Sequence, residues 1–141
     1  MNPYIHKVQY YETDMMGVAH HANYIRWMEE ARIDFMDQLG FPYTDMEAGG
    51  VISPVKSVSC DYKHPSAFGD RMSIHVLVES FDGVVMVIKY EMRNQKDSIV
   101  CEARSEHVFL NREGHFVRMR RELPDFCSAI DAAVIDTNAV R

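Results

Sequence analysis

Apolar side chains between residues 22 and 39 recur every three or four positions, the spacing of one face of an α-helix. Six side chains make up that face: Tyr24, Trp27, Met28, Ala31, Phe35 and Leu39. Three further apolar side chains lie outside it: Ile25, Ile33 and Met36. Asn23 is a candidate N-cap, and Gly40 followed by Pro42 is a stop signal. The pattern therefore predicts a helix over residues 22–39 that is buried on more than one side.

From residue 55 onward the apolar period changes from the helical spacing to two, the period of a strand. The predicted strands cover residues 4–10, 55–63, 72–78, 84–92, 99–110 and 115–119. Asp82–Gly83 is a tight-turn signal, so the two runs around it form a hairpin. Pro124 stands at a plausible first helical position and opens a short C-terminal helix.

The order of these elements is one strand, one long helix and then several strands joined by short turns. Antiparallel strands permit such short connections, whereas parallel strands need crossovers. We therefore expect an α+β fold, in which a curved antiparallel sheet of five to six strands wraps around one long central helix. The sequence has no repeat and no linker, and its 141 residues are close to the commonest domain size, so residues 1–141 are predicted to form a single domain. Such a sheet leaves an open edge that a second copy could pair with.

Composition excludes several classes of function. The formal net charge of −6 argues against a general binder of nucleic acid or of anionic membranes. No stretch approaches the roughly 20 apolar residues of a membrane span, and the N-terminal residues do not form a signal peptide. Cys60, Cys101 and Cys127 have no metal-type spacing and indicate reduced structural thiols in a cytoplasmic protein.

Residues 11–24, YETDMMGVAHHANY, place an acid, a glycine and a histidine pair just before the predicted helix. The start of a helix offers unpaired backbone N–H groups and the positive end of its dipole, which suits a developing negative charge. A simpler alternative is that Asp14 only satisfies backbone donors of its own loop. Metal binding by His20 and His21 is disfavoured, because adjacent residues cannot easily share one ion and nothing nearby completes a ligand set.

The element order and the run YYETDMMGVAHHANY (10–24) resemble the hot-dog-fold acyl-CoA thioesterases, in the branch that contains hydroxybenzoyl-CoA thioesterase. The matching positions are Asp14, Gly17, Val18, Asn23 and Tyr24, and His21 matches a position that is His in some members. The segment DYKHPSAFGD (61–70) resembles the turn that lies near the ligand in that family. The resemblance covers roughly residues 3–120, and it implies a hydrolase that needs neither a cofactor nor a metal.

Carried over to this sequence, the resemblance makes Asp14 the catalytic carboxylate, either aligning and deprotonating a water or attacking to form an anhydride. The backbone N–H at His21 would polarise the thioester carbonyl, while the His21 side chain is either a polar site group or a plain helix-start residue. Gly17 would let the chain turn sharply and approach the substrate, beside Val18 and Tyr24.

The basic residues leave two alternatives open. Lys63 and His64 are either phosphate-facing substrate contacts or ordinary turn residues. The cluster Arg118, Arg120 and Arg121 could likewise attract the phosphates of coenzyme A or simply be solvated.

The function expected from the resemblance is hydrolysis of an acyl-CoA by a homodimer or homotetramer. The alternatives are an acyl-[acyl carrier protein] thioesterase and a non-catalytic module that binds acyl-CoA; a hot-dog dehydratase ranks well below these.

Overall fold

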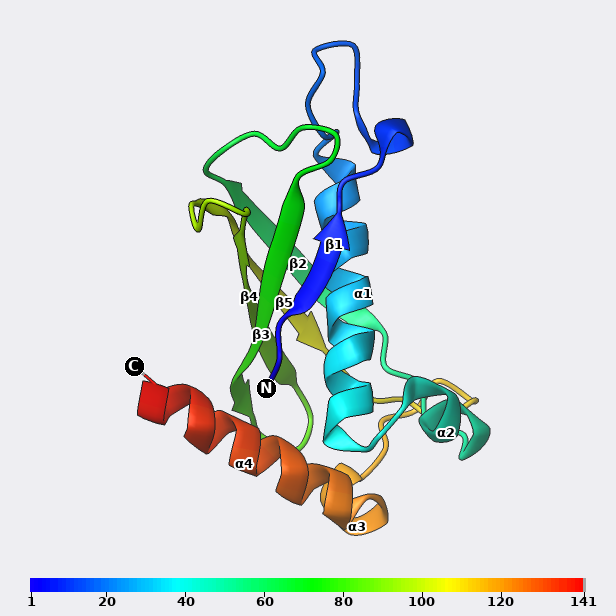
Figure 1. Ribbon diagram of the computed structural model, residues 1–141. Helices are drawn as coiled ribbons and strands as arrows, with labels where there is room; N and C mark the ends of the chain where they lie inside the picture. The colour runs from blue at the N-terminus through cyan, green and yellow to red at the C-terminus, as the bar shows by residue number, and fades with distance from the viewer. Residues whose placement is uncertain (141) are drawn as a thin grey trace. The chain divides into compact units, whose positions relative to one another are not determined.

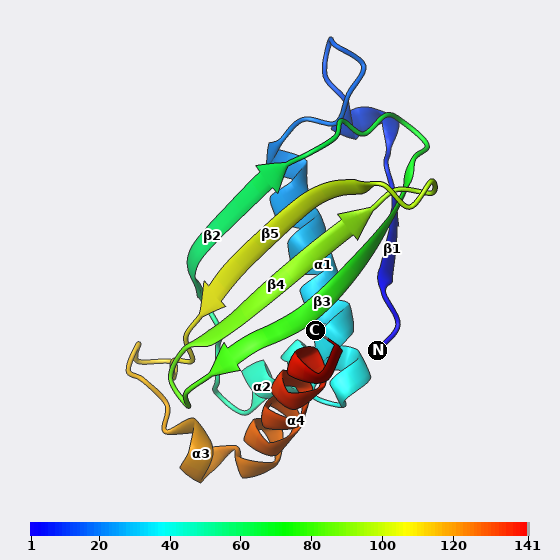
Figure 2. The same ribbon diagram turned by 90° about the vertical axis from the view of Figure 1, so that its left-hand side faces the viewer.

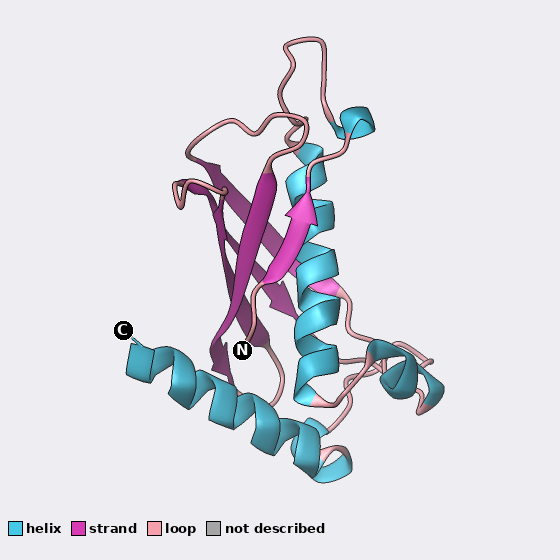
Figure 3. Ribbon diagram, in the orientation of Figure 1, coloured by secondary structure: helices cyan, strands magenta, loops and turns pink. Residues whose placement is uncertain are grey.

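The computed structural model describes residues 1–140, with side chains up to residue 138, so Arg141 of the expected 1–141 domain lies outside the described residues. Five strands form one antiparallel sheet in the order β1-β3-β4-β5-β2 (Figures 2 and 3). They are β1 (Tyr4–Lys7), β2 (Val55–Tyr62), β3 (Arg71–Phe81), β4 (Met86–Arg93) and β5 (Ile99–His107). The helices are α1 (Ala22–Leu39), α2 (Tyr43–Ala48), α3 (Met119–Glu122) and α4 (Pro124–Val140), with a 3-10 turn η1 (Tyr10–Glu12) (Figure 1).

Helix α1 has the predicted bounds, and Gly40 ends it with a φ of +90°, a conformation that favours glycine. The prediction that Asn23 caps the helix is wrong. Asn23 lies inside the first turn and donates a side-chain hydrogen bond to the Glu12 carbonyl, while His20 Nδ1 accepts the Ala22 N–H at 3.2 Å. Burial on more than one side is also wrong in part, because Met36 is buried but Ile25 and Ile33 are exposed.

The ends of the chain differ most from the sequence prediction. The first strand stops at Lys7, because the chain then turns into η1. Residues 115–119 do not form a strand; they make one isolated bridge, between Leu110 and Phe116, and then enter α3. Helix α4 is 17 residues long rather than short. Helix α2 was not predicted, because six residues with one buried side chain, Met46, are too few to show a period.

The described chain forms two compact units. The first contains Met1–Phe35, Ser59–Val76 and Tyr90–Ala103, and the second contains Met36–Val58, Leu77–Lys89 and Arg104 onward. In the first unit α1 lies against the sheet: Cys60 Sγ lies 3.5 Å from Met28 Sδ, and Arg32 Nη1 donates to the Tyr90 hydroxyl at 3.1 Å. The core side chains of this unit include Trp27, Met28, Met72, Ile74, Tyr90 and Met92.

The second unit is held together by aromatic edge contacts. The rings of Phe81 and Phe109 each meet Phe126, with centroids 6.4 and 5.5 Å apart, and Phe41 meets Phe126 at 5.5 Å. Such edge-to-face pairs add to the stabilisation from burial alone. Of the helices in residues 1–140, none has the length and apolar content that a membrane span requires.

Candidate active site

The loop between η1 and α1 protrudes beyond the end of the sheet (Figure 1). It closes on itself through a bridge between Thr13 and Ala19 and through the Asp14 N–H, which donates to the Val18 carbonyl at 2.9 Å. Gly17 sits at its turn with a φ of +79°, so the sharp turn expected at this glycine is present. The loop therefore presents Asp14 on a short, hydrogen-bonded turn.

The Asp14 carboxylate is exposed. Its Oδ1 accepts the Met16 backbone N–H at 2.8 Å, the Asx-type bond by which an aspartate stabilises its own turn. Its other oxygen has no donor within residues 1–140. Asp14 thus serves its loop with one oxygen and leaves the second one available.

A cavity of about 370 Å³ lies where α1 begins, in the first compact unit. Its walls come from the loop before α1, from α1 itself and from the end of β2 with the turn that follows. The lining residues are Val18, Ala19, His21, Tyr24, Tyr62, Lys63, His64 and Pro65. The structure therefore brings together the predicted residues Val18, His21, Tyr24, Lys63 and His64, whereas Asp14 and Gly17 are not among the lining residues.

At the start of α1, the backbone carbonyl of His21 is hydrogen-bonded and its backbone N–H is not. The carbonyl of His21 accepts the Tyr62 hydroxyl at 3.1 Å, which ties β2 to the helix start. The N–H of the same residue has no acceptor in the described part of the chain. That N–H is one of the unpaired donors expected at a helix N-terminus and is free to meet a substrate oxygen.

Aromatic rings form one wall of this cavity. The Tyr62 ring meets the Tyr24 ring edge to face with centroids 5.0 Å apart, and it meets the His21 ring in the same way at 6.3 Å. Burial, followed by the hydrogen bond with Cys60, raises the pKa of Tyr62 to about 12, and burial raises that of Tyr24 as well. Both phenols are therefore neutral near pH 7 and can act as hydrogen-bonding groups but not as bases.

All three cysteines are free thiols. A hydrogen bond with the Cys101 side chain lowers the pKa of the half-buried Cys60 to about 7, and the same bond raises that of the buried Cys101. Residues 1–140 contain no cluster of three or more His, Cys, Asp or Glu side chains arranged to hold a metal ion.

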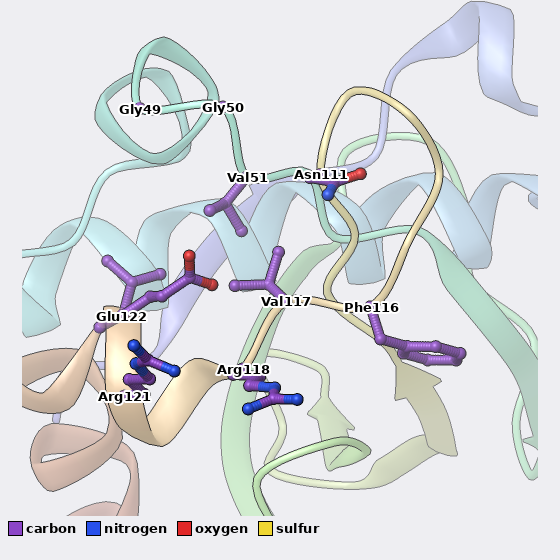
Figure 4. Close-up of a pocket in the computed structure, with 10 residues that line it drawn as sticks. Gly49, Gly50, Val51, Asn111, Phe116, Val117, Arg118, Arg121 and Glu122 are labelled. Atoms are coloured by element: carbon purple, nitrogen blue, oxygen red, sulfur yellow. The ribbon is translucent and has the colours of Figure 1, made fainter.

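A second cavity, of about 680 Å³, lies in the second compact unit between the end of α2, the loop at residues 111–118 and α3 (Figure 4). Arg118 and Arg121 line it, and their guanidinium groups lie on the same side of the cavity (Figure 4). Arg120 does not line it, because it pairs with Asp131 at 2.6 Å and lies 5.2 Å from the centre of the Phe81 ring. The predicted arginine cluster is thus divided into one structural residue and two cavity residues.

One residue beside the loop, Glu12, was not predicted from the sequence. Its carboxylate is buried and accepts three hydrogen bonds. Burial raises the pKa of Glu12, but the bonds from the Gln9 N–H, Trp27 and His6 outweigh that effect and leave the pKa below its usual value. The only signal in the sequence was an acid two positions before Asp14, which does not distinguish a buried side chain from an exposed one.

The five-stranded sheet with α1 against it is the α+β hot-dog fold, as predicted. The chain belongs to the thioesterase-like superfamily, which it matches over residues 8–134. The crystal structure of DHNA-CoA thioesterase from Staphylococcus aureus is 31% identical, covers 99% of this chain and 95% of its own, and has a TM-score of 0.93.

Two further relatives are similar in sequence. One is the Bacillus subtilis protein YneP, provisionally named an acyl-CoA thioesterase. It is 36% identical over 128 residues, covering 90% of this chain and 93% of its own length. The other is the acyl-CoA thioester hydrolase YbgC of Escherichia coli, 27% identical over 97 residues, covering 69% of this chain and 72% of its own.

Proposed function

We propose that this chain hydrolyses an acyl-CoA thioester with Asp14 as the reacting carboxylate and the N-terminus of α1 as the oxyanion site. Acyl-CoA thioester hydrolysis is the activity expected from the sequence, and the superfamily and the named relatives agree with it. The roles of Asp14 and of the His21 N–H are those that the resemblance implies. The oxyanion site is supported by one cavity in which Val18, His21, Tyr24, Lys63 and His64 meet at the start of α1. Asp14 does not line this cavity, and its role is supported by its place on the loop just before α1, with one carboxylate oxygen that has no donor within residues 1–140.

The chemistry follows from the groups present. As an oxygen nucleophile, either water or Asp14, adds to the acyl carbon, negative charge builds on the carbonyl oxygen, and the His21 N–H at the positive end of α1 can stabilise that charge. Asp14 either takes a proton from the attacking water or attacks the acyl carbon itself. When Asp14 deprotonates the water, the carbon–sulfur bond of the adduct breaks and the free acid forms directly. When Asp14 attacks, the same bond breaks and leaves a mixed anhydride on Asp14, which a water then hydrolyses to the free acid and the restored carboxylate. In both routes coenzyme A leaves as a thiolate and is then protonated.

We assign the polar end of the substrate to basic residues that line the same cavity. Lys63 and His64 lie at its wall on the turn after β2 and are the candidate contacts for the phosphates of coenzyme A. Arg118 and Arg121 line the other cavity and so have no part in this proposal.

The test is release of free thiol from short, medium, long and aromatic acyl-CoAs by the wild-type chain and by Asp14→Asn. The variant should retain binding and the Met16 hydrogen bond but lose about 10²–10⁴-fold in kcat, the range for a positioned general base. Its stability should change by no more than about 0.5 kcal/mol, because the side chain is exposed. Near-normal turnover by Asp14→Asn would remove Asp14 from the mechanism.

The same assay separates the alternatives. A non-catalytic module would bind acyl-CoA without releasing thiol. A thioesterase for acyl carrier protein would turn over the carrier-bound acyl group much faster than the same acyl-CoA.

We further propose that the chain acts as a homodimer or homotetramer in the cytoplasm. Strand β2 is at the edge of the sheet and every residue in it is exposed or half-exposed, so its backbone can pair with a second copy. Five large apolar side chains near the protruding loop are also exposed: Tyr10, Tyr11, Met15, Met16 and Phe68. Light scattering at micromolar concentration should show a dimer or tetramer, and a monomer would refute this part. The free thiols fit a reducing compartment.

A further inference from the structure

Glu12 is a buried carboxylate two residues before Asp14, with 5% of its surface exposed. Its Oε1 accepts the Gln9 backbone N–H at 2.8 Å and lies 2.8 Å from His6 Nε2. Its Oε2 accepts the Trp27 indole N–H at 2.6 Å. These donors belong to β1, to the residue before η1 and to α1, so one side chain joins three segments.

The backbone carbonyl of Glu12 is engaged as well. It accepts the His20 backbone N–H at 2.8 Å and the Asn23 side-chain amide at 2.9 Å. Because residues 13–19 lie between Glu12 and His20, these bonds join both ends of the loop that carries Asp14. Glu12 therefore connects the base of that loop to the start of α1.

Glu12 shares one hydrogen-bonding partner, His6, with a second carboxylate. His6 lies between two carboxylates, with Nε2 facing Glu12 and Nδ1 2.9 Å from Glu30 Oε2. An ionised carboxylate can only accept hydrogen bonds, and donors from the Gln9 N–H and the Trp27 indole face the two oxygens of Glu12. Burying a charged pair often stabilises a fold no more than a neutral replacement of the same shape. The advantage of the charge here is geometric, because charge-assisted hydrogen bonds are short and hold their partners closely.

We propose that Glu12 is a positioning residue that holds the loop of Asp14 in register with the N-terminus of α1. The inference rests on the proposed function in one respect, that Asp14 is the reacting carboxylate. In Glu12→Gln one acceptor oxygen becomes an NH₂ group, which then faces either the Trp27 N–H or the donors from Gln9 and His6. The base of the loop must shift to relieve this clash, and a displacement of about 1 Å at a reacting group can cost about 100-fold in rate.

The test is a double-mutant cycle on kcat. Glu12→Gln should lower kcat by about 10–100-fold when Asp14 is present, with KM changed by less than about threefold, because Tyr62, Lys63 and His64 lie on another segment. In the Asp14→Asn background the same change should lower kcat by less than about twofold, since a residue that acts through Asp14 has nothing left to position. A general loss of structure would lower kcat in both backgrounds and would overturn the proposal.

The matched control is Glu29→Gln, the same chemical change at an exposed position of α1. It should change kcat by less than about twofold in either background. Trp27 is the only tryptophan of the chain and donates to Glu12, so its fluorescence emission should shift in Glu12→Gln and stay unchanged in Glu29→Gln.

The outcomes separate this inference from the proposed function. If Asp14→Asn keeps normal turnover, the proposed function fails, and the positioning role fails with it. If Asp14→Asn loses activity but Glu12→Gln keeps normal kcat, only the positioning role fails. If Glu12→Gln does not fold, Asn23→Ala replaces it, because that variant keeps the buried carboxylate and removes one bond to the Glu12 carbonyl. It should lower kcat by about 3–10-fold only when Asp14 is present, and an equal loss in both backgrounds, or none, refutes the inference.

Discussion

Tyr24→Phe tests whether the phenol at the start of α1 is a structural group or a substrate contact. Tyr24 is 3% exposed, and its hydroxyl lies 2.8 Å from the hydroxyl of Ser66, which is fully buried. The segment around Ser66 is also joined to the loop before α1, because the Ala19 N–H donates to the Ser66 carbonyl at 2.7 Å. The hydroxyl pair therefore links α1 to the turn between β2 and β3.

The magnitude follows from these contacts. Removing the Tyr24 hydroxyl leaves the Ser66 hydroxyl buried without its partner, which costs about 1–3 kcal/mol. The ring contacts with Trp27 and Tyr62 remain, so no packing term is added. We expect the free energy of unfolding to fall by about 1–2 kcal/mol, equivalent to roughly 3–8 °C in Tm for a chain of this size. KM for the acyl-CoA should change by less than about twofold, because the hydroxyl is already paired inside the protein.

Urea denaturation of the wild type, Tyr24→Phe, Ser66→Ala and the double variant measures the pair directly. The double variant should be little less stable than either single variant, with a coupling energy of about 1 kcal/mol. Tyr11→Phe is the control, since this tyrosine is 81% exposed and the loss of its hydroxyl should cost no more than about 0.5 kcal/mol. Strictly additive losses, or unchanged stability with a KM raised more than about fivefold, would refute the structural role.

Three further predictions concern single groups. The lowered pKa of Glu12 contributes stability that is fully present above its unfolded value of about 4.5 and is lost as pH falls through its folded value. The stability difference between the wild type and Glu12→Gln should accordingly be largest near pH 7 and shrink below about pH 4.5 in urea titrations. Alkylation of Cys60 by iodoacetamide should reach its half-maximal rate near pH 7. The pKa values of Cys101 and Cys127 are raised, so peptide mapping should show slow alkylation of both thiols at that pH. Lys63→Ala should raise KM for acyl-CoA about two- to fivefold and leave kcat unchanged, with a difference that fades at high salt; an unchanged KM at low salt would remove Lys63 from the phosphate contact.

Local chemistry in the sequence determined the elements that depend on near neighbours. The bounds of α1 follow from side chains three and four residues apart and from Gly40, all within one segment. The turn at Gly17 is local in the same way, because it needs only a residue that adopts a positive φ. The alternation of apolar residues in β4 likewise marked its buried face, where Met86, Ile88, Tyr90 and Met92 are all covered.

The tertiary structure alone decided which distant residues meet. Tyr62 lines the same cavity as Tyr24, and the Tyr62 hydroxyl donates to the His21 carbonyl, although β2 is far from α1 along the chain. Arg120 pairs with Asp131, whereas Arg118 and Arg121 line a cavity. In the sequence these three arginines look like one cluster. Glu12 can be buried because its carboxylate hydrogen-bonds with His6 of β1 and with the Trp27 indole N–H of α1. A periodic pattern records which face of its own segment is apolar, but the partners of a polar side chain are set by which segments the fold brings alongside it.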